Sequence, residues 1–348
     1  MSEVHDEIRA QIEELAGCLV PSCRSDASHL ADAVRGLTGG RPLDAYGTWA
    51  WYPWSRRLVH VLPREAYRTV RTDRNRDKIT RAQQGDLLTR RIGIIGLSVG
   101  AAGALACAAE GVGGSFLLAD FDRLSLSNLN RLRAGVHELG LEKTVLCARA
   151  MAELDPYLDV RVYRRGLDES SLDDFMAAGP DLVIEECDTP WVKVAVRDHA
   201  RARRVPVLME ANDRGLLDVE RFDLEPDRPL LHGRIGELTA AAVKDLDPAS
   251  AIAFMLRAVG EDRLSAAMKE AIPRIGDTLS SWPQLASGVL LGGALVTDTA
   301  RRILLGEAVA SGSHCVDLAA LVPAPPGEAD GGAPLPAARE RIAVREVR

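Results

Sequence analysis

One stretch of this sequence, from Ile92 to Asp120, constrains the fold more than any other. It reads as an apolar strand over 92–95, a turn with the letters GLSVG, an alanine-rich helix, and a second apolar strand over 116–119 that ends in Asp120. This order predicts a β-α-β unit, whose two strands run parallel in one sheet with the helix on its face. We therefore expect an α/β fold with a doubly wound parallel sheet.

The turn of this unit carries Gly96, Ser98 and Gly100. A helix that begins at such a turn offers unpaired N–H groups and the positive end of its dipole, and both attract phosphate. A dinucleotide fingerprint would place glycines two and five residues after Gly96, where the sequence has Ser98 and Ala101. An NAD(P)-dependent oxidoreductase is thus disfavoured but stays an alternative, as do glycines that serve only close packing of helix on sheet.

Acidic, amide and basic side chains follow the second strand. Asp120 and Asp122 precede Asn128 and Arg131, and Lys143 opens an expected helix over 142–154. An acid at this strand end can accept ribose hydroxyls, and two cations can stabilise a pyrophosphate leaving group. Each cation alone is typical of a solvated surface, but the combination favours ATP.

A later strand, DLVIEECD, runs into Asp188. Parallel strands present ligands at their carboxyl ends, and Mg²⁺ needs only one or two carboxylates when substrate phosphates complete its shell. The alternative interpretation is helix capping, because Thr189 and Pro190 follow directly.

Together these motifs resemble the ThiF/MoeB/HesA superfamily of adenylating enzymes, relatives of the ubiquitin-activating enzymes, from about residue 74 to about residue 318. The resemblance implies a Rossmann-like sheet and an ATP-dependent adenylyltransferase. Such an enzyme activates a carboxylate, on the C-terminus of a small protein or peptide or on a small acid, as an acyl adenylate and releases pyrophosphate. It implies that Asp120 holds the ribose and that Asp188 holds magnesium. The implied nucleotide-binding set is Gly96, Ser98, Gly100, Asp120, Asp122, Asn128, Arg131 and Lys143.

The resemblance also implies a homodimer, in which the last arginine of an R-x-x-R-like segment reaches the ATP of the neighbouring subunit. Arg76 matches that position best, and a solvated basic connector is the alternative. The implied catalytic residues are Arg76, Arg131, Lys143 and Asp188. The family's usual turn, G-x-G-G-x-G, is one glycine longer than the turn here.

The cysteines and the charge narrow the class of protein further. The six cysteines form no C-x-x-C pair, so we expect no zinc, and none lies between Asp188 and Cys315. Scattered cysteines and an acidic N-terminus without a signal peptide predict a cytoplasmic protein. The formal charge of −7 argues against nucleic acid, and no apolar run is long enough for a membrane.

We expect an N-terminal α+β appendage over 1–70, a ThiF-type domain over 71–322 with a helical crossover region over 231–280, and a disordered tail over 323–348. The appendage is predicted to hold helices over 3–15 and 27–37 and an aromatic hairpin over 46–63. Further strands are predicted over 160–163, 182–186, 206–211 and 219–224, and a closing strand over 315–321.

A narrower resemblance concerns the segments around VPVLMEANDRGLLDVERF and YPWSRRLVHVLP. They are similar to the ThiF-type part of actinobacterial proteins that carry a nitroreductase-like flavin domain, which implies a separate flavoenzyme as a possible partner. A third alternative, a scaffold that binds nucleotide without catalysis, draws on the shortened turn.

Overall fold

The computed structural model describes residues 3–20 and 27–322. Within it, the chain up to Val316 forms one compact unit, and a second unit begins at Asp317 and includes the short helix α12 (Leu318–Leu321). The tail expected over 323–348 lies outside the described residues.

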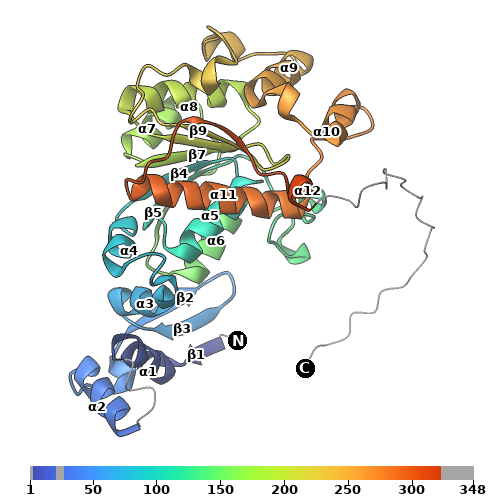
Figure 1. Ribbon diagram of the computed structural model, residues 1–348. Coiled ribbons are helices and arrows are strands. Elements are labelled where there is room, and N and C mark those ends of the chain that lie inside the picture. Colours follow the sequence, from blue (N-terminus) through green and yellow to red (C-terminus); the bar gives the residue numbers. More distant parts are fainter. Residues whose placement is uncertain (1–2, 21–26, 323–348) are drawn as a thin grey trace. The chain divides into compact units, whose positions relative to one another are not determined.

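Seven strands form the main sheet in the order β10-β9-β8-β7-β4-β5-β6 (Figure 1). The five strands from β4 to β8 pair in parallel, while β9 pairs antiparallel with both β8 and β10. Their bounds are β4 (Arg91–Ile95), β5 (Ser115–Ala119), β6 (Asp159–Tyr163), β7 (Leu182–Glu185), β8 (Val207–Glu210), β9 (Leu216–Glu220) and β10 (Gly312–Cys315). This confirms the expected α/β fold with a Rossmann-like sheet.

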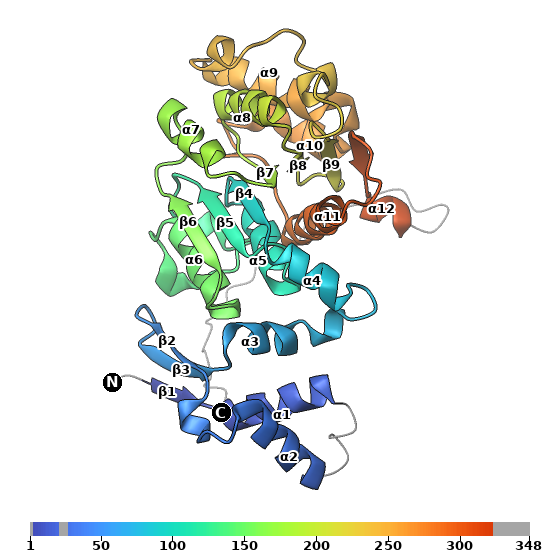
Figure 2. The same cartoon turned by 90° about the vertical axis from the view of Figure 1, so that its left-hand side faces the viewer.

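Helices cover both faces of this sheet (Figures 1 and 2). One face packs against α5 (Gly100–Glu110), α6 (Lys143–Leu154) and α11 (Ala286–Leu304), and the other against α7 (Glu169–Ala177) and α8 (Pro190–Arg203). Each face has its own apolar cluster because successive strand residues point to opposite sides. Ile94 and Leu118 lie in the first cluster, and Val183 in the second.

The N-terminal residues form a smaller sheet of order β1-β3-β2. Its elements are β1 (Glu3–Asp6), α1 (Ile8–Leu19), α2 (Ala27–Thr38), β2 (Thr48–Tyr52), β3 (Arg57–Val61) and α3 (Arg64–Arg71). Tyr67 donates a hydrogen bond to the Leu154 carbonyl at 2.8 Å, and Arg68 pairs with buried Asp155 at 3.0 Å. These contacts join α3 to the end of α6.

The remaining segments are mostly helical. α4 (Arg81–Leu87) precedes β4, and the stretch expected to form the crossover holds α9 (Pro248–Val259), α10 (Ala266–Ala271) and short 3-10 turns such as η6 (Leu230–Gly233). Among residues 3–20 and 27–322, none of the helices combines the length and the apolar character that a bilayer crossing requires.

Three expectations about local structure were wrong. Residues 3–6 form β1, not helix, because they pair in parallel with β3 and leave the helix to start at Ile8. The strand expected over 219–224 runs instead from Leu216 to Glu220, where it pairs with β8. The closing strand lies earlier than 315–321, since Gly312–Cys315 pairs with β9 and residues 318–321 are helical.

Candidate active site

The candidate site lies where the order of the parallel strands reverses. β4 is flanked by β5 on one side and by β7 on the other, so the carboxyl ends of these three strands meet at one edge. Open α/β sheets bind ligands in the crevice at such a position. The turn Gly96–Val99, the segment after Ala119 and the segment after Glu185 all leave from it.

Gly96 allows the turn to approach the end of β7. Its φ angle is +85°, and a Cβ atom there would lie 2.6 Å from the Glu186 carbonyl oxygen. Only glycine adopts this backbone conformation without strain and leaves room for the neighbouring backbone. The turn and the segment that carries Asp188 are therefore in direct contact.

Asp120 holds the turn in place. Its two carboxylate oxygens accept hydrogen bonds from the backbone N–H groups of Leu97, at 2.6 Å, and Asp122, at 2.7 Å. Burial raises the pKa of Asp120, although these two N–H groups oppose the rise. The Leu97 side chain is fully buried and anchors the turn at a position next to Gly96.

Arg131 reaches the same turn from the loop after β5. Its guanidinium donates to Ser98 Oγ at 3.2 Å, to the Ser127 carbonyl at 3.2 Å and to Asn130 Oδ1 at 2.8 Å. Burial lowers the pKa of Arg131, and the charge of Asp188 opposes this effect. Its buried Nε has no hydrogen-bond partner among the described residues.

Asn128 is buried, and its Oδ1 accepts the Ser125 N–H at 3.1 Å. Its side chain therefore closes the short 3-10 turn Leu126–Asn128 that leads to Arg131.

Lys143 begins α6, and its ammonium lies 2.7 Å from Asp122 Oδ2. The Lys143 side chain is 6% exposed, whereas that of Asp122 is 50% exposed. The Lys143 N–H also donates to the Asp122 carbonyl at 3.0 Å. Lys143 thus comes to the site already paired with an accessible carboxylate.

Asp188 follows β7 on the Gly96 side of the site. Its side chain keeps contact with solvent, yet the surrounding protein raises its pKa by burial, while the cations Lys193 and Lys143 lower it. Helix α8 takes Thr189 as its N-cap, without a side-chain cap bond. The N-cap of α8 is therefore Thr189 and not Asp188.

Arg76 does not join this group within one chain. It pairs with Asp73 at 2.8 Å, and neighbouring Asn75 donates to the Glu110 carbonyl at the far end of α5. Because α5 begins at the candidate site, its 11 residues place Arg76 roughly 15 Å or more away.

The sequence interpretation overlooked a buried charged group behind Asp188. Glu185 contacts Lys193 and Arg197 of α8, and Arg197 also contacts Glu220 of β9. The one available signal was the spacing of Lys193 and Arg197, four residues apart in the otherwise apolar first half of α8, which places both on one face.

Cys187 lies between this group and Asp188. Burial raises the pKa of its thiol well above the usual range, so the thiol stays neutral at physiological pH. Such a cysteine is poorly suited to accept an activated acyl group.

The fold and this edge of the sheet define a Rossmann-like domain with a charged site at its strand ends. In the comparison with known proteins, the sequence model of the ThiF family matches residues 72–228, so this region of the chain carries a ThiF family domain.

Two relatives and one solved structure illustrate the likeness. The chain is 45% identical over 296 residues to the uncharacterized protein MT1398 of Mycobacterium tuberculosis. The aligned region covers 84% of this chain and 41% of that protein. It is 30% identical over 149 residues to the molybdopterin-synthase adenylyltransferase of Haemophilus influenzae, or 42% of this chain and 60% of that protein. The chain thus spans less than two thirds of either relative.

The solved structure is the E. coli tRNA N6-threonylcarbamoyladenosine dehydratase TcdA in complex with ATP. It matches with a TM-score of 0.51 and 16% identity over 71% of this chain and 98% of that one. This likeness supports the fold.

Proposed function

We propose that this chain is an ATP-dependent adenylyltransferase that activates a carboxylate as an acyl adenylate and releases pyrophosphate. One observation carries the proposal: Arg131 contacts Ser98 in the turn before α5, and Asp188 interacts electrostatically with both Arg131 and Lys143, at the strand ends where this fold binds ligands. The likeness to an adenylyltransferase and to an ATP complex supports it.

The chemistry needs alignment and charge stabilisation. A carboxylate oxygen of the substrate attacks the α-phosphorus of ATP, a P–O bond forms, and the bond to the pyrophosphate oxygen breaks. No general base is required, because the attacking carboxylate is already ionised. The Arg131 guanidinium and the Lys143 ammonium would stabilise charge on the phosphates, and the N–H groups at the start of α5 would add to this.

The residues present fit magnesium. Among the described residues no group of three or more acidic, histidine or cysteine side chains could hold a metal, whereas Asp188 and Asp122 offer accessible carboxylates at the phosphate turn. This donor set suits Mg²⁺, which takes one or two carboxylates and completes its shell with phosphates and water. When bound, the ion would neutralise phosphate charge; Asp188 would hold it, and Lys143 keeps Asp122 in place.

ATP–pyrophosphate exchange with candidate carboxylates tests the function. Lys143→Ala and Asp188→Asn should each lower exchange by more than roughly a hundredfold, because the first removes a cation from the transferring phosphates and the second removes the carboxylate that would hold Mg²⁺. Arg302→Ala, which removes an exposed cation at the end of α11, is the matched control and should not change it. Near-normal exchange in either site variant would contradict the assignment.

We further propose a homodimer in which Arg76 completes the site of the partner subunit. Its distance from the site in its own chain and its 41% exposed side chain are consistent with such a role. Mixing an Arg76→Ala chain with an Asp188→Asn chain should then restore exchange, because one of the two mixed sites has both residues intact. A monomer with full exchange activity would refute this arrangement. The flavoenzyme partner and the cytoplasmic location stay predictions.

A further inference from the structure

A continuous chain of buried hydrogen bonds runs from the loop of Asp188 to the start of the crossover region. Glu185 Oε1 accepts the Cys187 N–H at 2.9 Å, and Glu185 Oε2 accepts from Arg197 at 2.6 Å. Arg197 Nε also donates to Glu220 Oε2 at 2.5 Å. Glu220 Oε1 then accepts the N–H of Leu231 at 2.6 Å.

These ionised groups are almost completely removed from water. Glu185, Lys193, Arg197 and Glu220 are exposed by only 0, 2, 0 and 1%. The two acids and two bases balance in charge, and Lys193 fills the remaining acceptor capacity of Glu185 at 2.8 and 2.9 Å. A buried network of this kind is stable only while every member is paired, so a change at one end is felt along it.

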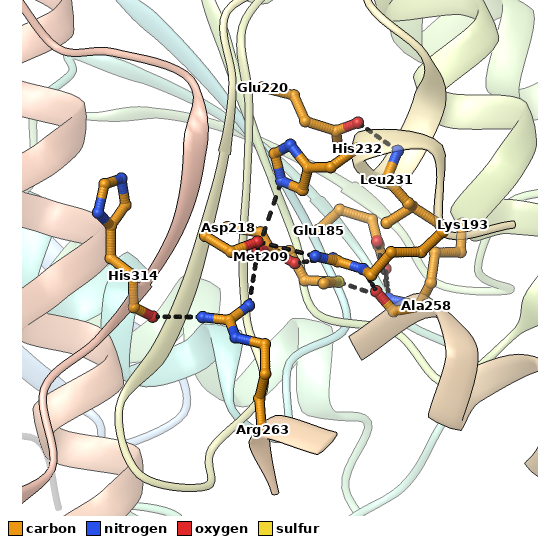
Figure 3. Close-up of polar contacts among 12 residues, drawn as sticks. Glu185, Lys193, Met209, Asp218, Glu220, Leu231, His232, Ala258, Arg263 and His314 are labelled. Carbon is orange, nitrogen blue, oxygen red and sulfur yellow. Dashed lines mark hydrogen bonds and ion pairs between the residues drawn. The ribbon is translucent and has the colours of Figure 1, made fainter. Parts of the chain in front are cut away.

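The hydrogen-bond network ends, on the side away from Asp188, at a strained turn. Leu231 and His232 have φ angles of +49° and +58°. This is a left-handed backbone conformation that residues other than glycine rarely adopt. Glu220 fixes the Leu231 N–H, and His232 lies 3.4 Å from buried Asp218 (Figure 3). Such strain persists only where the surroundings enforce it, and it is concentrated at ligand clamps and switch regions.

We propose that Arg197 and Glu220 are positioning residues, which hold the turn at Leu231 in a fixed relation to the loop of Asp188. The crossover region begins at this turn, and we expect it to contact the acyl substrate, while the loop of Asp188 would hold Mg²⁺. Arg197 and Glu220 would then fix these two parts of the site relative to one another. Figure 3 draws two contacts of this network, that of Glu185 with Lys193 and that of Glu220 with Leu231. The inference rests on the proposed function, which gives Asp188 its role.

Glu220→Gln is the sharpest perturbation. Both oxygens of Glu220 accept hydrogen bonds from donors, one from Leu231 and one from Arg197. A glutamine amide has the same shape but only one oxygen, so one of the two donors must lose its partner. Loss of one buried hydrogen bond should speed local amide exchange by about tenfold.

The experiment is hydrogen–deuterium exchange on the full chain, with and without MgATP. In the ligand-free protein, Glu220→Gln should speed exchange at residues 231–235 and also at residues 186–190, at the other end of the network. In the wild type, MgATP should protect both segments, and in the variant the protection at 231–235 should be lost. Arg197→Lys keeps the charge but not the planar fork and should give the same pattern.

Asp155→Asn provides the matched control. Asp155 is also fully buried, pairs with an arginine and accepts the backbone N–H of Tyr157 at 2.9 Å, but lies at the end of α6. It should lower global stability without a selective change at 186–190 or 231–235. The same pattern in the control, or faster exchange at 231–235 alone, would overturn the coupling.

The MgATP arm separates this inference from the proposed function. Protection at 186–190 without protection at 231–235 in the wild type would overturn the positioning role and leave the function intact. No protection at 186–190 would contradict the proposed function instead, and the ligand-free comparison would still decide whether the two segments are coupled.

Discussion

Replacing Gly96 with alanine should cost this protein much more stability than its backbone angle alone predicts. The left-handed conformation costs an L-residue roughly 1–2 kcal/mol. The new Cβ would also lie 2.6 to 2.8 Å from three backbone atoms of Glu186 and Cys187, which cannot rotate away as a flexible side chain could. Overpacking of this kind costs about 1–3 kcal/mol, so we expect a total of roughly 2–5 kcal/mol.

Gly140 provides a matched control for this substitution. Its φ angle is +84°, almost the same as that of Gly96, but nothing lies within 4 Å of the position its Cβ would take. Gly140→Ala should therefore lower the free energy of unfolding only by the cost of the left-handed backbone conformation. Alanine also lowers the entropy of the unfolded chain, but this effect is the same in both variants and cancels in the comparison. Urea denaturation of both variants should show the difference of about 1–3 kcal/mol.

MgATP titration calorimetry completes this test. A forced separation of the turn from the end of β7 moves the start of α5 away from Asp188, so Gly96→Ala should also weaken MgATP binding. Equal losses of stability in the two variants, or full MgATP affinity in Gly96→Ala, would show that the close approach is not a constraint on the site.

The other predictions concern pH. Burial by itself raises the pKa of Glu185, but Lys193 and Arg197 lower it to about 2, so its pKa is lower folded than unfolded. The free energy of unfolding should then fall as pH drops from about 5 to 2, by up to about 3 kcal/mol in denaturation curves, and Glu185→Gln should flatten that slope. Burial raises the pKa of Glu210 to about 8, so stability should fall as pH rises from about 4.5 toward 8. Glu210→Gln should be more stable than the wild type at pH 9 in thermal unfolding, and a less stable variant would contradict this.

The central strands could be predicted from the sequence because they are short apolar runs bounded by turn residues. The strands over 92–95 and 116–119 needed no long-range information. The strand β1 could not be predicted without long-range information, because all four of its residues are exposed and its pairing with β3 holds it extended. The edge strand β10 likewise shows no apolar alternation in its letters GSHC.

The candidate site was predictable to the extent that its residues follow strand ends in sequence. Arg131 and Lys143 could be placed near the carboxyl end of β5 because both lie in the connection from β5 to β6, Arg131 in its loop and Lys143 at the start of its helix. The contacts of Glu220 could not be predicted, since that residue is 35 positions beyond Glu185 and meets it only through Arg197 on the intervening helix. Local patterns carry no information on which buried acid pairs with which base.

The shortened turn illustrates how a departure from a family's motif can be compensated. A glycine-rich turn binds phosphate because its backbone N–H groups are free to point inward. Here the turn is held from outside, by Asp120 through the Leu97 N–H and by Arg131 through Ser98. The arginine that we expect to meet the phosphates therefore also fixes the turn that would cradle them. The geometry of the turn thus depends on side chains that a glycine motif does not contain.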